Sequence, residues 1–156
     1  MNKTVKLSRL RALDYIVNYS DATSSRSYYW AGSKGNNFVT KEVPYDVYEY
    51  LLMRTTCFRD GELVVAKDEP DKEELEEYMP DVEEYKNNAK SREEIIKLLK
   101  GNINALKKEL GKVTSISEKR FIKSIADEIA SSGDGLASTK VAFIDEWVKP
   151  SKQNDE

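Results

Sequence analysis

The side chains that could carry acid–base, nucleophilic or metal chemistry are scarce in this 156-residue sequence. It contains no histidine and a single cysteine, Cys57. Without histidine there is no histidine-based triad, no histidine general base and no histidine-containing zinc site. A transition-metal site would need carboxylates alone, which such metals do not favour. We therefore expect no catalytic residues, no metal and no cofactor, and we predict that the protein is not an enzyme.

The most suggestive cluster is aromatic. In a strand, alternation would place Tyr28 and Trp30 on one face and Tyr29 on the other. Interface cores favour tyrosine and tryptophan, although large aromatic side chains also fill small cores. A base-stacking platform needs flanking basic residues, and Arg26 and Lys34 are too few. The candidate protein interface comprises Tyr28, Tyr29, Trp30, Phe38 and Tyr48.

Basic residues gather in two predicted helices of the second half, at Lys107, Lys108, Lys112, Lys119, Arg120 and Lys123. On a purely structural interpretation, these residues form the solvated outer face of an amphipathic bundle. Their functional interpretation is contact with phosphate groups, which is independent of sequence and sensitive to salt. The candidate phosphate contacts are Lys107, Lys108, Lys119 and Arg120. These cations do not form the dense patch typical of nucleic-acid binding, so we do not expect nucleic acid as a partner.

The region 91–149 predicts a bundle of about four short helices. Ser91 opens a capping box with Glu94, and Gly101 is expected to end that helix in a left-handed conformation. Asn102, Ser117 and Ser138 are expected to cap the helices that follow. Isolated helices of this length are marginal in water, so each must be stabilised by packing on the others.

Alternating apolar residues in the first part of the chain predict strands instead. Turn signals at Gly35-Asn36-Asn37 and Asp60-Gly61 separate them, and Pro44 starts one short helix. The predicted fold class is α+β. A small, antiparallel, β-rich docking module (1–67) with that one helix is followed by an acidic linker (68–90), a helical bundle module (91–149) and a disordered tail (150–156).

Residues 68–90 are dominated by aspartate and glutamate, and Pro70 and Pro80 interrupt them. The simplest interpretation is a solvated linker with a turn or two of helix. The alternative is an acidic segment, Asp68–Glu84, that docks on a basic partner. No calcium site is indicated, because the Asp-x-Asp-x-Asp-Gly spacing is absent.

The composition, 39% hydrophobic and 34% charged, is typical of a soluble globular protein. No apolar run approaches the roughly 18 residues that span a bilayer, so we expect no membrane partner. Met1–Lys6 lacks the apolar core of a signal peptide. A lone cysteine cannot form an internal disulfide, which is typical of proteins that fold in a reducing compartment.

Two sequence patterns carry a family resemblance. The first contains an aromatic residue before Ala31-Gly32, then Val43-Pro44, Tyr48-Glu49-Tyr50-Leu51 and Phe58. The second contains Glu94–Asn102, then Leu106-Lys107, Leu110, Phe121-Ile122, Lys140-Val141 and Ile144. Together they resemble small proteins encoded in the head-gene region of tailed phages and prophages, of the YqbF-like and Mu-like type. The resemblance covers about residues 28–60 and 91–148, and residues 1–26 look like an extension before the family's usual start.

This resemblance implies a strand-rich N-terminal module joined to a LEM-like helical C-terminal module. It also implies a non-enzymatic virion structural protein, assembled in the host cytoplasm: a head-decoration, auxiliary capsid or head-completion protein. Its partners would be other virion proteins, above all the major capsid or a connector protein, and self-association stays open. Two alternatives are a nucleic-acid-binding or regulatory helical module, and a phage-encoded inhibitor of a host protein that uses Asp68–Glu84.

Overall fold

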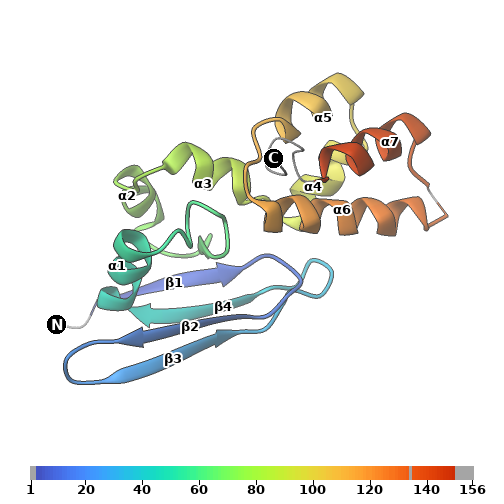
Figure 1. The fold of residues 1–156 in the computed structure, drawn as a ribbon. Helices are drawn as coiled ribbons and strands as arrows, with labels where there is room; N and C mark the ends of the chain where they lie inside the picture. The colour runs from blue at the N-terminus through green and yellow to red at the C-terminus, as the bar shows by residue number, and fades with distance from the viewer. Residues whose placement is uncertain (1–2, 134, 150–156) are drawn as a thin grey trace, which may run out of the picture.

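The computed structural model describes residues 3–133 and 135–149, which form the predicted α+β fold (Figure 1). The first part contains β1 (Thr4–Arg9), β2 (Tyr15–Ser20), β3 (Ser25–Trp30), β4 (Val39–Pro44), α1 (Tyr45–Arg54) and β5 (Val64–Val65). The rest is helical: α2 (Lys72–Glu77), α3 (Val82–Asn88), α4 (Arg92–Leu99), α5 (Ile103–Leu110), α6 (Ile116–Ala130) and α7 (Ser138–Trp147). None of the described helices has the length and apolar character needed to cross a membrane. The predicted tail, 150–156, lies outside the described residues.

Strand β1 is the central strand of an antiparallel sheet with the order β4-β1-β5. It pairs with β4 along its whole length, with Val5 opposite Val43, and with β5 at Leu7 and Ser8. Strands β2 and β3 form a separate antiparallel hairpin. The expectation that residues 1–26 are an extension is therefore wrong, because β1 is the strand that joins both edges of the sheet.

Strand alternation places the apolar residues of the sheet under α1. Val5, Leu7 and Val43 are fully buried, and they pack in one core with Val47 and Tyr48 of the helix. This arrangement confirms the predicted small antiparallel sheet with one short helix packed on it.

The acidic segment differs from the expected solvated linker. It forms α2 and α3, and Leu75, Met79 and Tyr85 are buried in the same core as α1. Residues spaced by three or four positions share one side of a helix, so a few apolar residues give these short helices an inward side. The carboxylates, among them Glu73 and Glu77, take the outer side.

Helices α4 to α7 surround a second core and confirm the predicted bundle of about four short helices. Ser91 caps α4 by accepting the N–H of Glu94 at 3.2 Å, as predicted, and Asn102 caps α5. Helix α6 begins earlier than predicted, because the hydroxyl of Ser115, not of Ser117, accepts the first-turn N–H.

The remaining helix ends in the bundle also differ from the sequence prediction. Gly101 does not adopt a left-handed conformation, because the right-handed Lys100 already closes α4 and the chain turns directly into the next cap. Helix α7 begins after Ala137 without a side-chain cap, so Ser138 is its first residue and not its cap.

Substitutions at two adjacent residues, Tyr78 and Met79, can test whether the acidic segment is part of the folded core. Met79 is 4% exposed and Tyr78 is 76% exposed. Because Met79→Ala removes buried apolar contacts, we expect it to lower the free energy of unfolding by about 2–4 kcal/mol. Tyr78→Ala, the matched control, is expected to change it by less than about 0.5 kcal/mol. Urea unfolding at micromolar protein measures both values, and equal, small changes would show that the segment is a solvated linker.

Candidate functional site

A buried arginine joins the β-rich part to the helical bundle. The guanidinium of Arg11 donates through Nε to Glu118 of α6 at 3.1 Å and through Nη1 to Glu62 at 2.9 Å. Its Nη2 donates to the backbone carbonyls of Asp60, at 2.5 Å, and Asn88, at 3.0 Å. The Arg11 side chain is only 3% exposed, and carboxylates from both parts of the chain compensate its charge.

Asn88, the last residue of α3, is completely buried and completes this junction network. Its side-chain amide donates to the carbonyl of Arg59 and to the hydroxyl of Thr114, both at 2.9 Å. Its Oδ1 accepts the N–H groups of Thr114 and Ser115, which precede α6. One asparagine therefore bonds the loop before β5 to the start of α6.

The electrostatics of the junction are dominated by desolvation. Burial raises the pKa of the Glu118 carboxyl to about 7, against the opposing effects of Arg11 and of the Lys90 N–H that it accepts. Burial also lowers the pKa of the Lys90 ammonium, whose Nζ donates to the carbonyl of Asn87. Charged groups that leave water are held here by hydrogen bonds and not by solvent.

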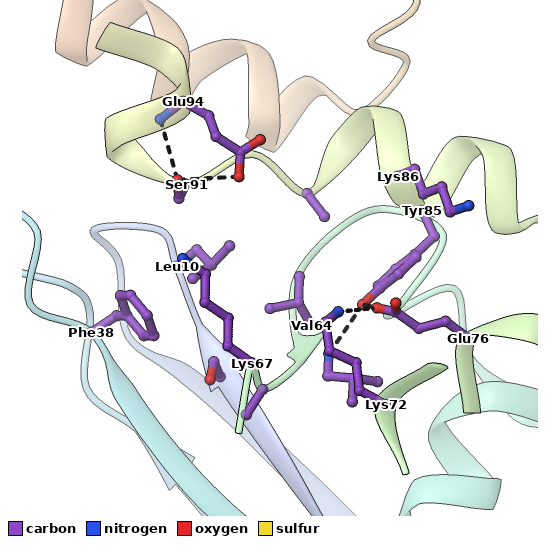
Figure 2. Close-up of a pocket in the computed structure, with 14 residues that line it drawn as sticks. Leu10, Phe38, Val64, Lys67, Lys72, Glu76, Tyr85, Lys86, Ser91 and Glu94 are labelled. Carbon is purple, nitrogen blue, oxygen red and sulfur yellow. Dashed lines mark hydrogen bonds and ion pairs between the residues drawn. The ribbon is translucent and has the colours of Figure 1, made fainter. Parts of the chain in front are cut away.

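A cavity of about 280 Å³ lies beside this network, where the sheet, α3 and the start of α4 meet (Figure 2). A second cavity of about 190 Å³ shares four of its lining residues. We call the combined depression the junction groove, and its principal lining residues are Leu10, Phe38, Val64, Lys67, Ala89 and Ser91.

Neighbouring residues in two segments point to opposite sides, one side chain into the junction groove and the next into the buried network. Leu10 lines the groove whereas Arg11 enters the network. In the connection to α4, Ala89 lines the groove and Asn88 and Lys90 contribute to the network. The hydrogen bonds that join the two parts of the chain thus also fix the walls of the groove.

One wall of the junction groove is held by a buried tyrosine. The hydroxyl of Tyr85 donates to Glu76 at 2.5 Å and accepts the N–H of Val65 at 3.1 Å, as Figure 2 shows. Burial raises the pKa of this phenol well above its ordinary value, so it stays protonated. Lys72 pairs with the same Glu76 carboxylate at 2.7 Å, whereas the exposed Lys67 and Lys86 make no ion pair with any described residue. The groove has an apolar floor and a rim of mixed charge, with Lys67 and Lys86 on one part and the exposed Glu93 and Glu94 at the start of α4 on another.

The described residues offer the groove no catalytic set. Within 3–133 and 135–149, no group of three or more aspartate, glutamate or cysteine residues is placed to hold a metal ion. Cys57 lies in the β-rich core, 3% exposed, and burial raises the pKa of its thiol to about 12. A thiol of that kind is a poor nucleophile.

The predicted aromatic interface is divided by the structure. Alternation is as predicted: Trp30 is fully buried and its Nε1 donates to the carbonyl of Leu7 at 3.0 Å, and Tyr28 packs against the same core. Tyr48 is also buried, so neither Trp30 nor Tyr48 is available to a partner. Tyr29 (47% exposed) and Phe38 (39% exposed) remain on the surface, and Phe38 lines the junction groove.

The predicted phosphate contacts are not brought together either. Lys107 lies over the ring of Phe143 and Lys119 over the ring of Trp147, both on α7. Arg120 lines a cavity with Leu13 of the β1–β2 loop, and Lys108 is exposed. The four cations therefore do not share one set of contacts.

Sequence reasoning missed the residues that frame the site, above all Arg11, Asn88 and Glu118. An arginine in a strand–turn region and a glutamate in a helix look like ordinary surface residues. The sequence contains one signal for Glu118. Ser115-Ile116-Ser117-Glu118 fits a capping box that starts at Ser115, two residues before the predicted cap Ser117.

Comparisons with protein families match both parts of the chain. Residues 3–81 match the family model described as the YonA N-terminal domain, and residues 91–154 match the YonA C-terminal domain. No curated protein and no solved structure has detectable similarity to the chain. The N-terminal match starts before β1, in agreement with the central place of that strand.

Glu118 is expected to make stability depend on pH. Its pKa is higher in the folded protein, about 7, than the ordinary value of 4.5, so the folded state binds the proton more tightly. The resulting stabilisation is complete below about pH 4.5 and is lost as the pH rises through about 7. Between pH 8 and pH 5 the unfolding free energy of the wild type should therefore rise, relative to that of Glu118→Gln, by up to about 3 kcal/mol.

Urea unfolding of both proteins across this pH range measures the difference. Glu128→Gln is the control, because Arg92 lowers the pKa of Glu128 and moves its titration below the range tested. Parallel profiles for the wild type and Glu118→Gln would contradict the prediction.

Proposed function

The chain belongs to the YonA family, a two-domain family named after a phage protein, and from this premise we propose that it is a non-enzymatic protein that docks other phage proteins. In this proposal it is a virion protein associated with the head. It would be either an auxiliary or decoration protein of the capsid or a head-completion protein. The proposed partner is the major capsid protein or a connector protein. Assembly would take place in the host cytoplasm.

The observation that carries the docking proposal is the junction groove. Its floor is apolar, with Leu10, Phe38 and Ala89, and its rim carries Lys67 and Lys86. Protein interfaces have this composition, an apolar centre surrounded by polar groups. The buried network around Arg11 fixes the walls before a partner arrives, so little ordering entropy opposes binding.

The charges of the rim select the partner. Lys67 and Lys86 are exposed and pair with no carboxylate in the described part of the chain. A segment that places an apolar side chain between two carboxylates would fill the floor and pair with these two lysines, and a cation farther along it would pair with Glu93 or Glu94 at the other part of the rim. On a symmetric shell, many weak contacts of this kind add up through avidity.

The two alternative functions have less support from the geometry. A nucleic-acid module needs its cations on one surface, but Lys107 lies over the ring of Phe143 whereas Arg120 lines a cavity with Leu13. A host inhibitor that used the acidic segment would need that segment to be free, whereas Leu75 and Tyr85 anchor it in the core. Only its outer side is open to a partner.

Phe38→Asp tests the groove in the particle. The side chain is half-exposed, so the substitution should leave the fold intact while placing a carboxylate on the apolar floor. We expect the copy number in purified phage particles, measured by quantitative mass spectrometry, to fall by at least about tenfold. Met53→Asp, which changes a 67% exposed apolar residue of α1 outside the groove, is the matched control.

Two outcomes would overturn the proposal. Absence of the wild-type protein from particles would remove the virion assignment, and a tight complex with one host protein would then favour the inhibitor. Wild-type copy number for a folded Phe38→Asp variant would show that the groove is not the dock.

A further inference from the structure

A second depression lies between the β1–β2 loop and α6, apart from the junction groove. Its volume is about 290 Å³, and it is lined by Ala12, Leu13, Ser117, Arg120 and Phe121, with Arg9 and Arg11 in its wall. Leu13, at its edge, is 77% exposed. We call it the loop–α6 groove.

Two exposed apolar residues also lie on the β2–β3 hairpin, which follows the loop that lines this groove. Ile16 is 58% exposed and lies opposite Tyr29, which is 47% exposed. The hydroxyl of Tyr29 donates to Asp14 at 2.7 Å, which fixes the position of the ring.

One charge distinguishes the loop–α6 groove. Arg9 and Arg11 in its wall already have carboxylate partners, since both pair with Glu62 and Arg11 also pairs with Glu118. Arg120 is exposed and makes no ion pair with any residue of the described ranges. The groove therefore suits a ring or branched side chain accompanied by carboxylates.

The chain itself presents such a segment. Tyr78 follows α2 and is 76% exposed, and the neighbouring Glu74, Glu77 and Asp81 are exposed as well. In Figure 1, α2 lies beside α1 at one end of the molecule, whereas the loop–α6 groove is formed where α6 meets the far end of β1. The segment cannot reach the groove of its own chain.

We propose that the protein associates head to tail, with Tyr78 of one copy seated in the loop–α6 groove of the next. The carboxylates around Tyr78 would pair with Arg120, and the ring would cover Leu13 and Phe121. Each contact joins two different surfaces, so every pair leaves one groove and one Tyr78 free. Such heterologous contacts extend into open chains or close into rings. This inference does not rest on the junction groove.

Sedimentation velocity over a range of concentrations tests the association. The wild type should shift from monomer to species larger than a dimer as its concentration rises, and added salt should weaken the shift. Tyr78→Ala and Arg120→Glu should each weaken the association at least about tenfold. Met53→Ala and Lys108→Glu, which make the same kinds of change at other exposed positions, should not.

Mixing the two weakened variants tests the geometry. Tyr78→Ala keeps an intact groove and Arg120→Glu keeps an intact Tyr78, so a mixture should form one-to-one dimers and nothing larger. A wild type that stays monomeric up to millimolar concentration would overturn the proposal. So would oligomers that both substitutions leave unchanged, or a mixture that gives no dimer. None of these outcomes involves Phe38, so the proposed function is judged separately.

Discussion

The structure depends on the compensation of one buried positive charge. The guanidinium of Arg11 donates to Glu62, to Glu118 and to two backbone carbonyls, and the farthest acceptor, Glu118, is 107 residues from Arg11 in the sequence. Removing one member of such a group leaves the others desolvated without a partner, and this costs far more than a surface ion pair is worth. The junction network therefore holds the β-rich part and the helical bundle in one arrangement.

Because of this network, the β-rich part and the helical bundle are joined rigidly and not by a flexible tether. Two modules on a flexible tether would reach partners at variable distances, and their effective concentration would follow from the tether length. Here the segment between them is folded: Met79 and Tyr85 are in the β-rich core, and Asn88 is in the junction network. Surfaces on the two parts, such as those at Phe38 and Arg120, consequently keep a fixed position relative to each other.

Local patterns predicted most of the fold because the physics that forms each element is local. The alternation through Tyr28, Tyr29 and Trp30 and the caps at Ser91 and Asn102 are satisfied within a few residues, and the structure confirms them. The acidic segment was missed because its charges dominate the composition, although three apolar side chains suffice to bury one side of two short helices. Composition describes the outer surface of that segment, not its packing.

The candidate site could not be predicted in the same way. A buried Arg11 is stable only if Glu118 lies beside it, and no pattern within either segment indicates that pairing. Its aromatic ring makes Phe38 a candidate in the sequence, but it lines a groove only because the β3–β4 connection meets the start of α4. The grooves of this chain thus arise from the way distant segments are joined, and the buried network around Arg11 that joins them fixes which side chains line each groove.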